Sequence, residues 1–258
     1  MLSEYERVVA VWRVSKNQIG LKHAVIKPHQ ILEAFLDGRC YLIWGFGIAM
    51  GILNGGVSNF ASAIIKGFGF DGLRASLLQT PGGAFQMIGC IAIGYFSQLP
   101  NMLGVAIIIG CLPGMAGLIG ILTIPIEQRY ALTACAWLQS IVGSPIILSW
   151  SVSAVNVAGH TKRTVVIGTY FALYCVGNIA GPHLFLDREV PRYPTAIKGL
   201  LGTYCVAIVI QGVYTFWCWV ENKRRDKRGL HAEAKEQELL EGFEDLTDKE
   251  NKHFRYRL

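Results

Sequence analysis

Charged residues are scarce in this sequence, and their scarcity argues against a soluble domain. Asp, Glu, Lys and Arg make up 16% of the 258 residues, whereas a soluble domain usually carries nearer a quarter. Hydrophobic residues make up 52%, and the mean hydropathy is +0.37. The charges that are present lie at the two ends of the chain and in short connections. The composition therefore favours a protein that lies in a membrane.

Signatures of catalysis and of nucleic-acid binding are also missing. The sequence contains no HExxH, no GxSxG, no Walker A loop and no pair of carboxylates inside an apolar segment. We therefore expect neither an enzyme nor an ATP-driven pump, and no cofactor or metal. The net charge of +6 comes from tails and loops without interleaved aromatic residues, so no nucleic-acid partner is predicted. The seven cysteines have no metal-ligand spacing, which favours small apolar fillers.

Six apolar segments follow one another, each about as long as a span across a hydrocarbon core of roughly 30 Å. None contains Asp, Glu, Lys or Arg. Because lipid offers no hydrogen-bond partners, such segments must be helical. The sequence therefore predicts an all-α membrane protein with six transmembrane helices. The segments are Cys40–Ile65, Ala75–Ser97, Asn101–Ile124, Ala131–Asn156, Thr164–Leu186 and Gly199–Val220.

Polar regions flank the predicted six-helix bundle of residues 40–220. Residues 1–39 form an N-terminal segment, in which Ser3–Val14 and Pro28–Asp37 are expected to be short helices. Residues 221–258 are predicted to be a solvated cytoplasmic tail that is partly helical or disordered. An excess of Lys and Arg on the side of both ends places both ends in the cytoplasm. The basic cluster Lys223–Arg228 is either a stop signal for the last helix or a contact for anionic headgroups.

Small residues and helix breakers mark several of the predicted spans. Gly47, Gly51 and Gly55 recur every fourth residue, and Gly177 and Gly181 repeat this spacing. Such stripes allow neighbouring helices to approach closely. Pro residues predict interrupted helices, because Pro removes a backbone donor, and breaks of this kind are typical of transporter binding sites. The expected breaks lie at residues 80–83, 143–145 and 181–182.

Uncharged polar side chains inside the spans are the candidate binding residues. Tyr170, Tyr174 and Asn178 lie at i, i+4 and i+8, so they share one helix face. Such groups suit hydrogen bonding to a small polar solute, or they serve as glue between helices. The candidates for substrate binding are Asn54, Asn59, Gln86, Tyr170, Tyr174 and Asn178.

Taken together, several motifs resemble the fungal allantoate permease (anion:cation symporter) family of the major facilitator superfamily. The likeness covers nearly the whole chain and corresponds to the C-terminal half of the family's fold, starting inside its central loop. The motifs are Glu6–Val11, Asn17–Gly20, Asn54–Gly56, Ile64–Phe70, Pro81–Gln86, Ala158–Arg163, Gly177–Pro182 and Glu221–Asp226. The connection Ser97–Asn101 departs from the family, because it lacks the usual basic residues.

The resemblance implies proton- or cation-coupled transport of small organic anions of the allantoate or carboxylate type, in the plasma membrane. Its implied partners are the lipid bilayer, an organic anion, and a separate N-terminal half-transporter or a second copy of the chain. The charges that pair with the anion are expected in the other half. The alternative is a non-transporting membrane scaffold or regulatory fragment, or a truncated gene product.

Overall fold

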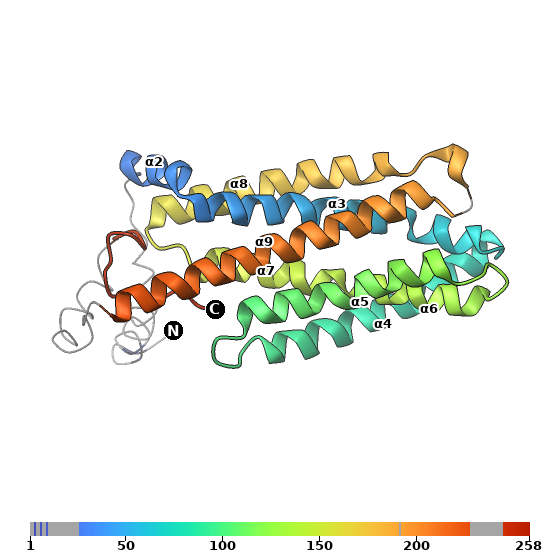
Figure 1. Cartoon of the computed structure of the whole chain (residues 1–258), viewed down its shortest axis with the longest axis horizontal. Helices are drawn as coiled ribbons and strands as arrows, with labels where there is room; N and C mark the ends of the chain where they lie inside the picture. Colours follow the sequence, from blue (N-terminus) through green and yellow to red (C-terminus); the bar gives the residue numbers. More distant parts are fainter. Residues whose placement is uncertain (1–2, 4–5, 7–8, 10–25, 191, 228–244) are drawn as a thin grey trace.

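The computed structural model is a bundle of long helices that run along one common axis (Figure 1). It describes residues 3, 6, 9, 26–190, 192–227 and 245–258, without the side chains of residues 59–64 and 187. The predicted helix Ser3–Val14 lies mostly outside the described residues. Within the described part of the chain every regular element is a helix, which confirms the all-α prediction.

Six long helical stretches correspond to the six predicted spans. The fourth consists of two helices joined by the 3-10 turn η1 (Ser140–Val142), and the fifth ends in the 3-10 turn η2 (Gly181–Leu184). Two shorter elements are α2 (Pro28–Leu36), which confirms the second N-terminal helix, and the 3-10 turn η3 (Asp187–Glu189). The long helices are α3 (Gly38–Gly67), α4 (Gly72–Phe96), α5 (Leu103–Thr123), α6 (Arg129–Gln139) with α7 (Gly143–Val155), α8 (His160–Ala180) and α9 (Pro194–Asp226).

Five of these stretches are long and apolar enough to cross a membrane. They contain α3, α5, the α6–α7 pair, α8 and α9, and they confirm five of the predicted spans by length and composition. Helix α4 has 25 residues but is not among the five. Helix α4 is long enough to cross a membrane, but Gln79, Thr80 and Gln86 lower its mean hydropathy. The second predicted span is therefore a helix of spanning length whose most apolar stretch has a lower mean hydropathy than those of the other five.

The predicted helix breaks have mixed outcomes. The break before Pro145 is confirmed, because η1 separates α6 from α7 immediately upstream of Gly143. The break at Gly181–Pro182 is also confirmed, since α8 ends at Ala180 and η2 follows. The break at residues 80–83 is wrong: α4 continues through Pro81. A spanning helix tolerates proline where neighbouring groups satisfy the freed carbonyl.

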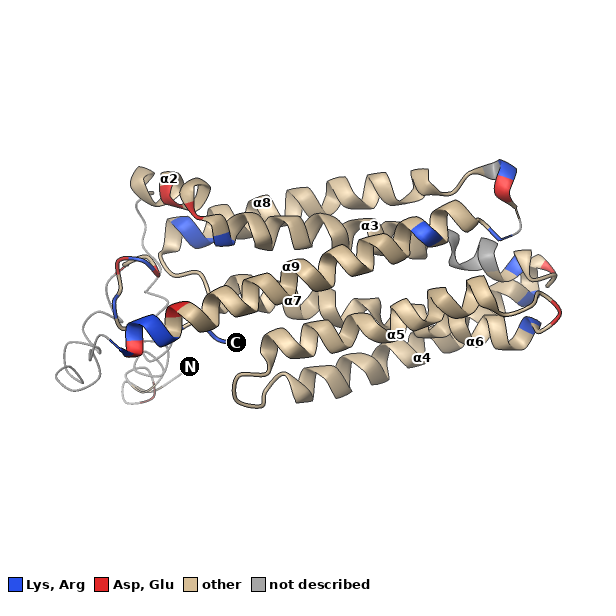
Figure 2. Ribbon diagram, viewed as in Figure 1, with Lys and Arg blue, Asp and Glu red and all other residues tan. Residues whose placement is uncertain are grey.

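Helix α3 is the centre of the bundle, since it packs most extensively on α8 and then on α9, while α5 packs on α6 and α9. Charged side chains gather at the two ends, and the middle of the bundle is uncharged (Figure 2). Large apolar side chains such as Ile88, Ile91 and Val209 remain mostly exposed. Because an apolar surface of this extent suits lipid rather than water, the distribution supports a bundle that lies in a bilayer.

The last residues of the chain do not form the predicted solvated tail. Residues 245–258 pack against the same end of the bundle as α2, and Phe254 and Tyr256 are buried. The Leu103 N–H donates to the Leu258 carbonyl at 2.6 Å. Asn156 donates to the Arg257 carbonyl at 2.8 Å and accepts from the Arg257 N–H at 2.7 Å. The prediction of a solvated tail is therefore wrong for this segment, which we call the C-terminal segment.

Candidate functional site

The glycine stripe of α3 forms a close seam with α8. A Cβ atom on Gly51 would overlap the carbonyl oxygen of Tyr174, and one on Gly55 would overlap that of Asn178. From the other side, a Cβ on Gly177 would overlap the carbonyl oxygen of Ile48. Only backbone fills the space at these points, so the two helices touch directly. This confirms that the stripes permit close helix approach.

Two of the predicted binding residues meet across this seam. The side-chain amide of Asn54 on α3 donates to the Asn178 Oδ1 on α8 at 2.8 Å. Asn178 in turn donates to the Tyr174 carbonyl at 2.9 Å. Both asparagines are half-buried. The pair satisfies part of its hydrogen-bonding capacity internally, as interhelical glue does, and keeps donor and acceptor capacity for a solute.

Tyr170 lies deeper and contacts a third helix. Its hydroxyl is 2.6 Å from the Ser149 Oγ on α7, and its ring packs over Gly47. Beside it lies a cavity of about 10 Å³ with Gln211 and Tyr214 of α9 in its wall. That volume is about the size of one water molecule. Gln211 and Ser149 are buried polar groups in spans. Gln211 was not among the predicted binding residues, although an amide in an apolar helix was a sufficient signal.

Gln86 is separate from the asparagine pair and lies on α4. Its side-chain amide covers the backbone of Gly143 at the start of α7, where a Cβ would overlap it. The rest of Gln86 is exposed. On the next helices the Trp150 and Tyr174 rings lie edge to face, with centroids 6.2 Å apart. Contacts therefore lead from Gln86 on α4 through α7 to Tyr174 on α8. We call Gln86, Trp150 and Tyr174, with Asn54 and Asn178 behind them, the polar face.

The structure thus brings together most, but not all, of the predicted site. Asn54, Tyr174 and Asn178 form one group, Tyr170 joins Ser149 on the inner side, and Gln86 lies at the α4–α7 contact. The side chain of Asn59 lies outside the described residues.

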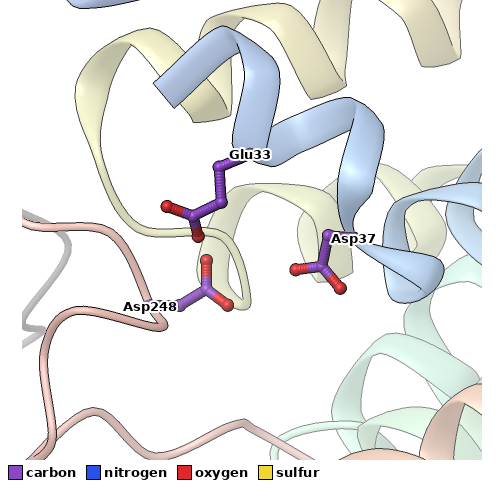
Figure 3. Close-up of side chains that lie close together, drawn as sticks. All are labelled: Glu33, Asp37 and Asp248. Atoms are coloured by element: carbon purple, nitrogen blue, oxygen red, sulfur yellow. The ribbon is translucent and has the colours of Figure 1, made fainter. Parts of the chain in front are cut away.

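A buried charged cluster closes one end of the bundle and was not predicted. Lys162, in the first turn of α8, is 0% exposed. Its ammonium donates to Glu33 Oε1 at 2.9 Å, Asp37 Oδ2 at 3.1 Å and Asp248 Oδ1 at 2.6 Å. The three carboxylates come from α2, from the turn before α3 and from the C-terminal segment, and they point toward one another (Figure 3). The lysine ammonium therefore occupies the position that a bound cation would take among them.

Arginines extend this cluster into a network. Arg39 donates to Asp37 and to Asp248, each from Nη2 at 2.7 Å. Arg225, at the end of α9, donates to the backbone carbonyls of Asp248 and Phe254, both at 2.8 Å. These bonds join α2, α3, α8, α9 and the C-terminal segment. Pairs separated by more than 200 residues, such as Arg39 and Asp248 with a separation of 209, leave no local pattern in the sequence.

The cluster sets the ionisation of Asp37. Burial raises the pKa of this carboxyl, but the hydrogen bond and charge of Arg39 and the charge of Lys162 outweigh burial and hold the pKa well below its ordinary value of 3.8. Since the folded pKa is depressed, the carboxylate stabilises the fold above about pH 4, and that contribution is lost as the pH falls further.

We therefore expect the melting temperature of the detergent-solubilised chain to be insensitive to this group from about pH 7 to about pH 5 and to fall below about pH 4. In the Asp37→Asn variant the acid-dependent part of that fall is expected to shrink, because residue 37 no longer titrates. A fall in melting temperature below about pH 4 that is equally large in both proteins would contradict the assignment.

Comparison with known proteins shows that the chain is similar to fungal transporters. An allantoate permease of Saccharomyces cerevisiae is 34% identical over 100% of the chain and 49% of its own length. A protein named as an uncharacterized transporter of Schizosaccharomyces pombe is 34% identical over 99% of the chain and 49% of its length. An MFS-type transporter of Penicillium expansum is 28% identical over 99% and 52%. No family model matches the chain, and no solved structure is similar to it.

These relatives are transporters and permeases rather than enzymes, in agreement with the motifs that predicted a C-terminal half. The chain spans about half the length of the curated relatives it matches. The helical bundle, its membrane-length apolar helices and this similarity along the whole chain fit the C-terminal half of a transporter of the major facilitator superfamily.

Proposed function

We propose that the chain forms one six-helix bundle of a transporter for small organic anions of the allantoate or carboxylate type, with coupling to protons or another cation. The bundle supplies one wall of the substrate pathway, and the polar face is that wall. A transporter of this superfamily works by rocking two bundles about a site near the middle of the membrane. The other wall comes from a separate N-terminal half or from a second copy of this chain.

The observation that carries the proposal is the exposed part of the polar face, Gln86 and Trp150, on an otherwise apolar bundle surface. Gln86 is exposed on α4, the one long helix that falls short of the apolar character of a span. An amide directed into hydrocarbon is costly, so such groups normally face a bundle interior or a water-filled cavity. On α7, Trp150 is 43% exposed, and Tyr174 on α8, whose ring it contacts, is half-buried. Amide, indole and phenol groups can hold a small polar solute by hydrogen bonds and ring contacts.

The charge distribution supports a two-part site. The middle of the bundle contains no Lys or Arg, and the basic residues lie at its ends (Figure 2). A carboxylate substrate that leaves water requires a cationic partner. This bundle would therefore supply hydrogen bonds and shape, and the other half would supply the pairing charge and the coupling group. The excess of basic residues beside both ends supports a cytoplasmic location for the termini, and the similarity to an allantoate permease supports the plasma membrane as the location of the bundle.

Transport is tested by supplying the missing half. The chain is expressed in a permease-deficient yeast together with the half of the S. cerevisiae allantoate permease that it does not match. Uptake of radiolabelled allantoate and other small carboxylates is measured for the pair and for each part alone. We expect uptake only when both halves are present. No uptake by the pair, when both parts reach the membrane, would favour a non-transporting scaffold.

Two substitutions test the polar face in that assay. Gln86→Ala and Tyr174→Phe each remove one hydrogen-bonding group, and the described residues give neither group a hydrogen-bond partner within the chain. We expect each substitution to raise the substrate KM about tenfold, since a lost hydrogen bond to a charged solute costs about 1.5–3 kcal/mol. Met87→Ala removes the exposed neighbour of Gln86 and should leave KM unchanged. If Met87→Ala and Gln86→Ala raised KM equally, the polar face would not be the substrate wall.

A further inference from the structure

We propose that a basic pocket at the end of the bundle that holds the C-terminal segment binds a phosphate group, presented by an anionic phospholipid. The pocket has a volume of about 260 Å³. Four cationic side chains and two aromatic rings line it, from the start of α3, the end of α9 and the C-terminal segment: Arg39, Arg224, Arg225, Lys249, Trp217 and Tyr256. Basic pockets between spanning helices, close to the membrane surface, suit lipid headgroups.

Arg39 provides a buried donor that the protein itself does not use. Its guanidinium lies over the Tyr256 ring, 4.5 Å from the centroid, and its side chain is 9% exposed. The Nε and Nη2 groups donate to Asp37 and Asp248, whereas Nη1 is buried with no hydrogen-bond partner among the described residues. A buried N–H without a partner is costly, so Arg39, which lines this pocket, has the capacity for an additional acceptor.

Arg224 and Lys249 are the two cations free to close on a ligand. Their side chains are 64% and 43% exposed. Each makes only a long ion pair, from Arg224 to Glu221 at 3.8 Å and from Lys249 to Asp37 at 3.6 Å. The Arg224 pair lies at the surface, where a pair of that length contributes little, and Asp37 is held more closely by Arg39 at 2.7 Å and Lys162 at 3.1 Å than by Lys249. Both side chains can therefore turn to an incoming phosphate without breaking the fold.

The acidic groups near the pocket do not cancel its charge. Glu221 is the one carboxylate among its lining residues, and Arg225 donates to it at 3.1 Å. Asp37 and Asp248 face Arg39 from the buried side, where Lys162 also neutralises them. The lining thus presents more positive than negative side chains, and the acceptor-rich phosphate complements it.

The surface below the pocket favours a lipid as the source of the phosphate. Trp217 and Trp219 are 44% and 41% exposed, and tryptophans of this kind lie at the level of headgroups. The Lys223 ammonium covers the Trp219 ring at 3.9 Å. Toward the middle of α9, Val213, Phe216 and Val220 are exposed apolar side chains. A headgroup in the pocket would therefore place its acyl chains along this helix.

The test uses the full chain, purified in detergent, and titrates it with dioctanoyl phosphatidylserine, dioctanoyl phosphatidylinositol phosphate, dioctanoyl phosphatidylcholine or inorganic phosphate. Binding is measured by tryptophan fluorescence and by native mass spectrometry. The variant Arg224→Gln/Lys249→Gln removes two lining cations. Its matched control is Lys227→Gln/Lys252→Gln. These two exposed cations lie at the end of α9 and in the C-terminal segment, as Arg224 and Lys249 do, but they do not line the pocket. Arg224→Lys/Lys249→Arg keeps the charge.

We expect an anionic lipid to bind more tightly than phosphatidylcholine, and about tenfold more weakly to the Arg224→Gln/Lys249→Gln variant. The control and the charge-keeping variant should bind as the unmodified chain does. Saturable binding of inorganic phosphate with the same dependence would support the phosphate site and identify a soluble source. Equal weakening in the lining variant and its control, or no preference over phosphatidylcholine, would overturn the proposal. Gel filtration and circular dichroism of each variant establish that it is folded.

Discussion

Replacing Lys162 with alanine is expected to lower the free energy of unfolding by about 3–5 kcal/mol and to release the C-terminal segment from the bundle. The ammonium is completely buried and binds three carboxylates at 2.6–3.1 Å. Without it, Asp248 keeps Arg39, Asp37 keeps Arg39 and the longer pair with Lys249, and Glu33 loses the ion pair that the described residues give it. Buried charges left in this way are among the most destabilising defects in proteins.

Arg163→Ala is the matched control, because Arg163 is the next residue on α8 and makes no ion pair with the described residues. Its effect is expected to stay within about 0.5 kcal/mol. Stability is measured by thermal unfolding in detergent, and release of the segment by the rate of proteolysis after residues 249–255. If the two alanine variants unfold alike and are cleaved at equal rates, the charged cluster does not hold the segment.

The second large effect is expected from a single methyl group in the seam between α3 and α8. Gly177→Ala would place a Cβ against the Ile48 carbonyl oxygen and 2.9 Å from the Gly51 Cα. Because these are backbone atoms, no side chain can move aside, and the helices must separate along their closest contact. We expect a loss of about 3 kcal/mol, at the upper end of the usual cost of overpacking.

Gly168→Ala provides a control on the same helix with the opposite sign. Gly168 has nothing within 4 Å of a built Cβ, so alanine there only improves helix propensity. A gain of up to about 1 kcal/mol is expected. Both changes are measured by unfolding of the detergent-solubilised chain. Equal shifts in the two variants would show that α3 and α8 do not meet at Gly177.

The helices and their closest contact could be predicted from the sequence, because both follow from local spacing. Charge-free segments of membrane length identify the spans, and glycines four residues apart identify the seam. The predicted break at Pro81 was wrong because a proline in the sequence does not show whether neighbouring helices compensate for the lost backbone hydrogen bond. Helix α4 also shows that length and lack of charge do not measure polarity, since uncharged glutamines count against a span.

The structure brings some of the predicted binding residues together, and their role in binding stays a prediction. The i, i+4 spacing from Tyr170 to Asn178 correctly placed these residues on one face of α8, but that face packs on α3, so its hydrogen bonds are largely internal. The charged cluster could not be predicted, since Asp248 and Arg39 are 209 residues apart in the sequence. Acidic residues in a polar tail are also normally expected to be solvated. Tertiary contacts of this separation require the fold itself.

The bonds of Lys162 also have a mechanical consequence. They connect α2, α3 and α8 with the C-terminal segment at one point that is shielded from water. Separating those charges costs several kcal/mol, many times the thermal energy. In the proposed transport cycle these elements should thus move as one rigid unit. The distance between a spin label on α2 and one on the C-terminal segment would then stay the same throughout the cycle. Bending would be concentrated at interruptions of the helices such as η1.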